Sequence, residues 1–374
     1  MEQVESKEEH AEHVKQELSL GIWEKYLTLW IAVCIVAGLL VGRFFPAFGV
    51  FMDSLKFANL SIPIGILLFF MMYPTVLGIR FSDVKMASRN PKPLLVTLIA
   101  NWIVAPIIMT FLANIILTSL LPGNSLLPEY VAGVILLGLS PCTAMVMWWM
   151  LLARGNMAQG LINTAVNAML MLLLYAPLAA LYLGISSIPV PWDLIALSVL
   201  VFIALPVAAG ALSRTLIIKK KGEEWFKNVY TAAVGKVSIV ALLLTLVVLF
   251  SFAGQTILND PLLVGYLALP NLFHYAIMIA WTYPLGYFLG WKYETVIDTT
   301  LIGSSSHFEV AIAVAVTLYG IGSGAALATV VGPLFEVPLM LSVVWLGLRT
   351  RKYFPRKKQA KSEEVASGIK NSKP

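Results

Sequence analysis

The sequence is poor in charged residues and in cysteine. Only 12% of its 374 residues are Asp, Glu, Lys or Arg, which is about half the share of an ordinary soluble domain. The two cysteines, Cys34 and Cys142, lie far apart, without the spacing of a metal site or a disulfide framework. A Walker phosphate-binding loop, an HExxH motif, a nucleophile–base pair and any cofactor motif are also absent from the sequence. These absences argue against an ATP-driven pump and against an enzyme.

Hydrophobic residues take the place of the missing charge. They make up 59% of the sequence and give a mean hydropathy of +0.84. They recur in runs of about 20 residues, the length at which a helix crosses a bilayer. We therefore predict an all-α polytopic membrane protein with ten transmembrane helices. The expected spans are 27–45, 60–79, 94–118, 130–152, 162–185, 193–212, 231–253, 263–290, 296–320 and 325–348.

Polar segments flank this ten-helix domain, which we place at 26–348. Residues 1–25 are rich in acidic residues and have no basic segment ahead of an apolar run, so we expect a cytosolic leader rather than a signal peptide. Residues 349–374 are expected to form a basic cytosolic tail that contacts membrane lipid. The net charge of +6 lies in loops and in this tail, which indicates orientation in a membrane and not nucleic-acid binding.

The positions of the 26 Lys and Arg residues predict the topology. If the N-terminus is cytosolic, all of them except Arg43, Lys56 and Lys236 fall in cytosolic loops or tails. Arg43 and Lys56 fall outside, and Lys236 lies near the inner end of its span. Because cytosolic loops are enriched in Lys and Arg, we predict cytosolic N- and C-termini and a multi-pass protein of the plasma membrane.

Polar residues interrupt two of the expected spans near their centres. Ser140-Pro141-Cys142 interrupts one, and 303–309 (GSSSHFE) interrupts another five spans later. Exposed backbone groups are tolerated inside a bilayer only where protein or a cavity covers them. Paired interruptions in the two halves of a chain therefore indicate the binding site of a transporter. The alternative is that Pro and Ser only kink two ordinary helices.

The interruptions fall in the fourth span of each half of the chain. The halves are 27–185 and 193–348, with five spans each. A repeat with an odd number of spans reverses its orientation when the chain continues. The pattern thus predicts two inverted five-helix repeats with discontinuous helices 4 and 9 crossing near the midplane.

The first interruption has the residues of a helix start. Ser140 suits an N-cap and Pro141 suits the first helical position, so we predict that a half-helix begins here. Cys142 would then lie in the first turn, where the helix dipole favours a thiolate and hence a soft ligand. The alternative, a small buried residue, applies to many free cysteines and is our interpretation of Cys34.

The second interruption repeats this logic with an acid. Gly303 breaks the span, and Ser306 with Glu309 three residues later fits a capping box. Glu309 can act as a cap, as a proton carrier, or as both, because an ionisable residue at membrane depth is costly and is a functional candidate. His307 has two open roles, a proton relay or a hydrogen-bond partner across the break.

Three further polar residues lie in apolar spans. Glu336 precedes Pro338 and is either a proton carrier or a packing hydrogen-bond partner of another helix. Asn163 and Asn167 lie four residues apart on one helix face, where they either line a polar cavity or, as we favour, pair helices.

The motifs resemble those of the arsenical-resistance permeases, the arsenite efflux carriers of the bile acid/arsenite/riboflavin transporter superfamily. The resemblance covers about 25–350. Its motifs are 138–146 (GLSPCTAMV), 308–315 (FEVAIAVA), 331–338 (VGPLFEVP), 61–63 (SIP) and 71–74 (MMYP).

The resemblance implies secondary active efflux of arsenite, and in some members antimonite, in exchange for protons. It also implies ten helices that form a panel and a core domain. The family's essential thiol maps to Cys142 and its coupling acids map to Glu309 and Glu336. Asn167 maps to the family's asparagine of helix 5. Ser140 and Thr143 flank the thiol and are expected to complete a substrate site.

One departure from the family pattern concerns His307. Ser306-His307-Phe308-Glu309 stands where many members have Asn-Asn-Phe-Glu, so a histidine lies close to the expected coupling acid.

The rival interpretation is a sodium-coupled organic anion symporter of the bile-acid type on the same fold. Ser304, Ser305, Ser306 and Glu309 would then contribute to a sodium site, although such a site has no use for a thiol. A sensor module is a further alternative.

Overall fold

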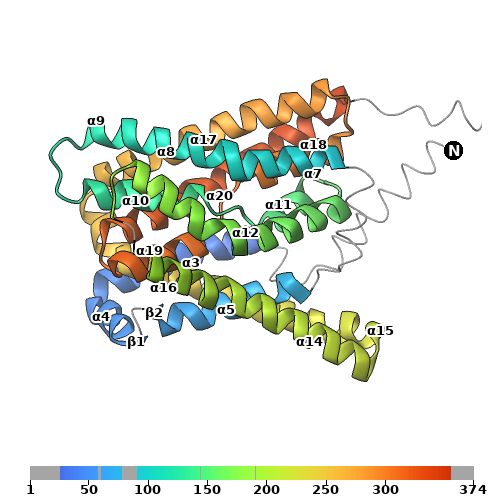
Figure 1. Ribbon diagram of the computed structural model, residues 1–374, viewed down its shortest axis with the longest axis horizontal. Helices are drawn as coiled ribbons and strands as arrows, with labels where there is room; N and C mark the ends of the chain where they lie inside the picture. Colours follow the sequence, from blue (N-terminus) through green and yellow to red (C-terminus); the bar gives the residue numbers. More distant parts are fainter. Residues whose placement is uncertain (1–25, 58–59, 78–90, 144, 190, 355–374) are drawn as a thin grey trace, which may run out of the picture.

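The computed structural model describes residues 26–57, 60–77, 91–143, 145–189 and 191–354. The expected leader and all but the first residues of the expected tail lie outside them. The described chain is almost entirely helical, which confirms the predicted all-α class (Figure 1). A small antiparallel hairpin pairs β1 (Lys56–Phe57) with β2 (Leu60–Ser61).

The helices follow the order of the apolar runs. In the first half they are α3 (Leu27–Phe44), α4 (Pro46–Ser54), α5 (Ile62–Leu77), α7 (Pro91–Ile99), η1 (Ala100–Val104), α8 (Ala105–Leu112), η2 (Ala113–Leu117), α9 (Thr118–Leu120), α10 (Leu127–Gly138), α11 (Met145–Leu152) and α12 (Met157–Ile185). In the second half they are α13 (Trp192–Val199), η3 (Leu200–Ala204), α14 (Leu205–Lys221), α15 (Glu223–Trp225), η4 (Phe226–Thr231), α16 (Ala232–Asn259), α17 (Pro261–Phe288), α18 (Tyr293–Ser304), α19 (Phe308–Tyr319), α20 (Gly324–Thr350) and η5 (Arg351–Tyr353).

Six helices in the described chain are long and apolar enough to cross a membrane, judged by length and composition. They are Pro91–Leu120, Met157–Ile185, Trp192–Lys221, Glu223–Asn259, Pro261–Phe288 and Gly324–Tyr353. Shorter apolar helices accompany them at Leu29–Phe44, Ile62–Pro74, Leu127–Gly138 and Phe308–Tyr319. Many of these helices expose large apolar side chains such as Leu29, Phe111, Leu200 and Phe273. A helical protein with this outer surface is a polytopic membrane protein.

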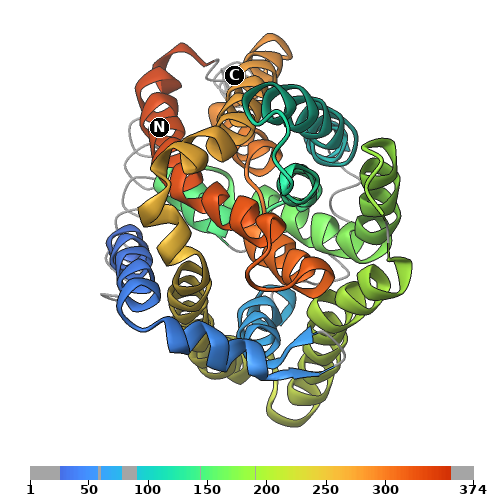
Figure 2. The ribbon, with the colours of Figure 1, turned by 90° about the vertical axis from the view of Figure 1, so that its left-hand side faces the viewer.

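The helices pack in two groups. The four-helix group consists of α3, α5, α14 and α16, and the crossing group consists of α10, α11, α17, α18, α19 and α20 with α7 and α8. The end-on view of Figure 2 shows the four-helix group in its lower part and α8, α17 and α20 in its upper part. α12 contacts α10, α11 and α18, and α13 contacts α12 and α19. Both also contact η3, which contacts α5 and α14, so they link the two groups.

Glycines allow the closest approach within the four-helix group. A Cβ on Gly42 of α3 would collide with the backbone carbonyl oxygen of Ser251 in α16. A Cβ on Gly254 of α16 would lie 2.9 Å from the carbonyl oxygen of Leu39. In lipid, where no hydrophobic effect drives helices together, such backbone contact supplies much of the packing energy.

Both interrupted spans are broken in the structure, so the alternative of two merely kinked helices is wrong. α10 ends at Gly138 and α11 begins at Met145, while α18 ends at Ser304 and α19 begins at Phe308. The two linking segments pair through an antiparallel bridge between Pro141 and Ser306. Their freed backbone groups therefore bond each other instead of facing lipid.

The local geometry of the first interruption differs from our prediction. Ser140 is not an N-cap: its hydroxyl donates to the carbonyl oxygens of Leu137 at 3.0 Å and Leu136 at 3.4 Å, so it closes the end of α10. Pro141 is not in a first helical turn, because it lies in the extended bridge. The capping rules act over a few residues and cannot anticipate pairing with a segment far along the chain.

The second interruption also differs from the predicted capping box. His307, not Ser306, holds the N-cap position of α19, and no side chain caps this helix end. Gly303 is not part of the break, since it lies in the last turn of α18, where a Cβ would come 3.2 Å from that of Ala100. The Ser306 N–H is bonded to Glu336 instead, which leaves Ser306 extended.

Candidate transport site at the crossing

The backbone of the two interruptions forms a short two-stranded crossing. The Cys142 N–H donates to the Ser305 carbonyl oxygen at 3.2 Å, and the His307 N–H donates to the Ser140 carbonyl oxygen at 2.6 Å. All four residues are buried. The crossing, defined as 140–142 with 305–307, thus brings together segments from the two halves of the chain.

The Cys142 thiol is buried at this crossing. The side chain is 2% exposed, and its sulfur faces the N–H of Val146 in the first turn of α11 and the Ser305 hydroxyl. Although Cys142 is not helical, its sulfur still meets the N-terminal end of a half-helix, as the sequence suggested. Thr143 follows it and is also buried, with no hydrogen-bond partner for its hydroxyl among the described residues.

Glu336 connects α20 to the crossing. Its Oε1 accepts the Ser306 N–H at 3.0 Å, and its Oε2 accepts the Tyr275 hydroxyl of α17 at 3.0 Å. Glu336 is 2% exposed. The interpretation of a hydrogen-bond partner to another helix is therefore confirmed, and the carboxylate also orients the second interruption.

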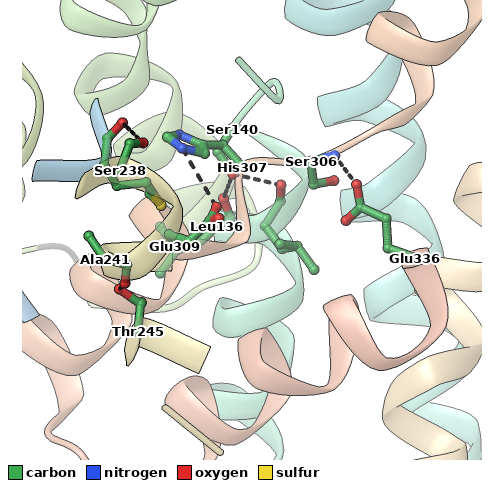
Figure 3. A network of polar contacts seen from close by, with 11 residues as sticks. Leu136, Ser140, Ser238, Ala241, Thr245, Ser306, His307, Glu309 and Glu336 are labelled. Carbon is green, nitrogen blue, oxygen red and sulfur yellow. Dashed lines mark hydrogen bonds and ion pairs between the residues drawn. The ribbon is translucent and has the colours of Figure 1, made fainter. Parts of the chain in front are cut away.

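Glu309 and His307 lie on the other side of Ser306 (Figure 3). The His307 Nε2 atom is 3.6 Å from Oε2 of Glu309, and both side chains are buried. In the described chain no Lys or Arg forms an ion pair with either Glu309 or Glu336. Two acids without cation partners, at a buried break, are placed to exchange protons or to bind a cation.

The two asparagines of α12 pair helices. The Trp102 indole N–H donates to Oδ1 of Asn167 at 2.9 Å, and the Asn163 amide donates to the Thr97 hydroxyl at 3.2 Å. This confirms the interpretation that we favoured. Asn167, expected at the substrate site, therefore has its carbonyl oxygen engaged by η1 and not by the crossing.

Two residues of the site were not found from the sequence. Tyr275 holds Glu336, and the Tyr175 hydroxyl of α12 donates to the Leu136 carbonyl oxygen at 3.2 Å, near the end of α10. A tyrosine in an apolar span is a weak signal, because its ring alone explains its presence there. In the part of the chain that the structure describes, His, Cys, Asp and Glu form no cluster suited to a metal ion.

Discontinuous helices that meet backbone to backbone, with buried acids at their junction, define a membrane transporter. The chain belongs to the sodium bile acid symporter family, whose family profile matches residues 65–260. This is a family of transporters, so the prediction that the protein is not an enzyme is confirmed.

Relatives extend the match over nearly the whole chain. An uncharacterized transporter, slr0944, of Synechocystis sp. is 46% identical over 350 residues, which cover 90% of this chain and 91% of that protein. The arsenical-resistance protein Acr3 of Alkaliphilus metalliredigens is 41% identical over 342 residues, covering 90% and 95%. The protein of the same name from Corynebacterium glutamicum is 31% identical over 350 residues, covering 90% and 92%. The resemblance to the arsenical-resistance permeases is thereby confirmed.

Proposed function

We propose that the protein exports arsenite, and its congener antimonite, across the plasma membrane in exchange for protons. The observation that carries the proposal is the crossing itself, which places one thiol among two buried acids. The names of the two Acr3 relatives support arsenite as the substrate. Arsenite at neutral pH is largely the neutral acid As(OH)3, so its binding needs no side chain of opposite charge.

The proposed architecture has ten crossings in two inverted five-helix repeats. The antiparallel bridge between Pro141 and Ser306 supports it, because a two-fold axis in the membrane plane relates segments in this way. In this scheme the four-helix group is the panel and the crossing group is the core. Both termini are cytosolic, and rocking of the core against the panel alternates access.

Cys142 is the proposed substrate ligand. Its thiol exchanges with one hydroxide of As(OH)3, so that an S–As bond forms, an As–O bond breaks, and the thiol proton leaves with the hydroxide as water. A single sulfur holds arsenic more weakly than three sulfurs would, and weak holding permits release. Ser140 and Thr143, adjacent to the thiol, complete the proposed substrate site.

Glu309 and Glu336 are the proposed proton carriers. Protonation of Glu309 from outside favours return of the empty site to the cytosolic side, where loss of the proton permits loading. His307, at 3.6 Å from Glu309, relays the proton. A potential of 100 mV supplies roughly 2.3 kcal/mol per proton, enough for a gradient of about 50-fold.

Arsenite uptake into everted vesicles tests the thiol step. We expect Cys142→Ser to lower the initial rate by about tenfold or more, since a hydroxyl is a poor ligand for soft arsenic. Cys34→Ser is the matched control and should keep the wild-type rate, because Cys34 lies outside the crossing on α3. Full activity of Cys142→Ser would reject the thiol as ligand.

A second candidate function is sodium-coupled transport of an organic anion. The membership of the sodium bile acid symporter family favours it. Two vesicle preparations separate the candidates, one with a proton gradient alone and one with a sodium gradient alone. Accumulation of arsenite under the proton gradient supports efflux by exchange, whereas accumulation of a bile-acid-type anion under the sodium gradient supports the second candidate.

A further inference from the structure

Asp298 is a buried acid of α18 that the crossing does not use. Its side chain is 0% exposed, and neither carboxylate oxygen has a hydrogen-bond partner among the described residues. The Asn156 N–H faces this carboxyl group, but it donates to the carbonyl oxygen of Glu294 at 3.4 Å. A polar group buried in this way is unfavourable unless something compensates it.

The turn between α11 and α12 covers this carboxyl group closely. A Cβ on Gly155 would collide with Oδ1 of Asp298, and one on Gly160 would lie 4.0 Å from Oδ2. Gly155 does not have a positive φ, so glycine serves here to let the backbone approach the carboxyl group. The Tyr293 hydroxyl fixes the same turn by donating to the Ala153 carbonyl oxygen at 2.8 Å.

The charged neighbours of Asp298 do not supply a counter-charge. Glu294, one turn earlier on α18, has the same sign and is bonded to Arg351 at 2.7 Å. Tyr293 is the other titratable group beside Asp298. Other elements also pack against α18, namely α7, α11, α12, α17, η1 and α20. Among their described residues none forms an ion pair with this carboxyl group. Arg154, in the covering turn, forms no ion pair with it in the described chain.

A carboxyl group buried without a cation is stabilised when it binds a proton. Asp298 lies seven residues before Ser305, roughly 10 Å along the helix axis, between the N-terminal end of α18 and the crossing. We propose that Asp298 is a further proton-binding site of the transporter, separate from the acids at the crossing, which exchanges protons between the cytosolic side and the crossing as the turn at Gly155 opens and closes. The binding of a proton by Asp298 does not depend on the proposed function, but its role in coupling proton movement to arsenite transport does.

Infrared difference spectroscopy on the purified protein tests proton binding without any substrate. A pH step should produce a carboxylic acid C=O band that shifts when the wild-type protein carries carboxyl-labelled [13C]aspartate, and that disappears in Asp298→Asn. Asp193→Asn, a change of an exposed acid on α13, is the matched control and should keep the band. The labelled wild-type protein gives a result even if Asp298→Asn does not fold. Absence of a label-sensitive band in it overturns the proposal. A band that responds to Na+ at constant pH would also overturn it, in favour of a sodium site.

Transport measurements test the role in coupling. In everted vesicles, Asp298→Asn should lower proton-driven accumulation of arsenite by about tenfold or more while exchange of arsenite at equal pH on both sides stays near wild type. Wild-type coupling in this variant would reject the role of Asp298. If the wild-type protein itself moves no arsenite, the proposed function fails, whereas the infrared result on Asp298 still stands.

Discussion

At the scale of single residues, hydrogen bonds to backbone groups organise the crossing. Glu336 accepts the Ser306 N–H and the Tyr275 hydroxyl, so one carboxylate joins three segments of the chain. Because the group is buried, loss of one partner leaves an unsatisfied atom in a medium without water. Tyr275 is therefore as much part of the site as the acid that it holds.

Replacement of Tyr275 by Phe should destabilise the protein by about 1–2 kcal/mol, because Oε2 of Glu336 loses its donor. Thermal unfolding in detergent measures this change. Tyr287→Phe is the control, since Tyr287 lies on the same helix but is exposed, and it should leave the midpoint unchanged. Equal midpoints for the two variants would mean that Glu336 does not depend on Tyr275.

At the scale of helices and linking segments, close backbone contacts decide the packing. α3 and α16 approach through Gly42, whose missing side chain makes room for the Ser251 carbonyl. A backbone atom cannot swing away as a flexible side chain can, so the contact specifies the relative position of the two helices.

We expect Gly42→Ala to cost about 1–3 kcal/mol, since the methyl group forces α3 and α16 apart. Gly265→Ala in α17 is the matched control, because nothing lies within 4 Å of its added Cβ and alanine favours a helix. Unfolding midpoints of both variants check the prediction. A midpoint for Gly42→Ala at or above that of Gly265→Ala contradicts it.

The comparison between sequence and structure is clearest at the interruptions. Ser and Pro residues correctly predicted where 130–152 and 296–320 break, because Pro removes a helical hydrogen bond and Ser competes for backbone groups. Gly303 was wrongly included, since it lies within α18. The predicted starts of the half-helices after each break were wrong. Cys142 and His307 are hydrogen-bonded to backbone groups far along the chain, which local capping rules do not take into account. Asp298 was overlooked although an acid inside an apolar span is itself a signal.

At the scale of the whole molecule, the two helix groups meet around a small cavity. Its volume is about 110 Å3, and its lining includes Thr256 of α16, Tyr130 of α10, Val316 of α19 and Ala326 of α20. The four-helix group thus faces the crossing group across space that a relative movement would change. Figure 1 shows the turn between α9 and α10 at one end of the molecule and α15 at the other.

Labelling with a membrane-impermeant maleimide tests the proposed orientation. Ser125→Cys, in the exposed turn before α10, should react in intact cells, whereas Lys220→Cys, near the end of α14, should react only in everted vesicles. The native Cys142 is buried and should not contribute to the signal. The reversed pattern of labelling would place both termini outside.

The bridge between Pro141 and Ser306 also constrains how the protein can move. The Cys142 and His307 N–H groups donate its two backbone hydrogen bonds, and no water is at hand to replace these bonds if the segments slide apart. We therefore expect the two broken helices to move as one rigid body that includes the thiol and the acids. A change in the side from which the crossing is accessible then comes from movement of the four-helix group relative to this body, and not from a rearrangement of the crossing.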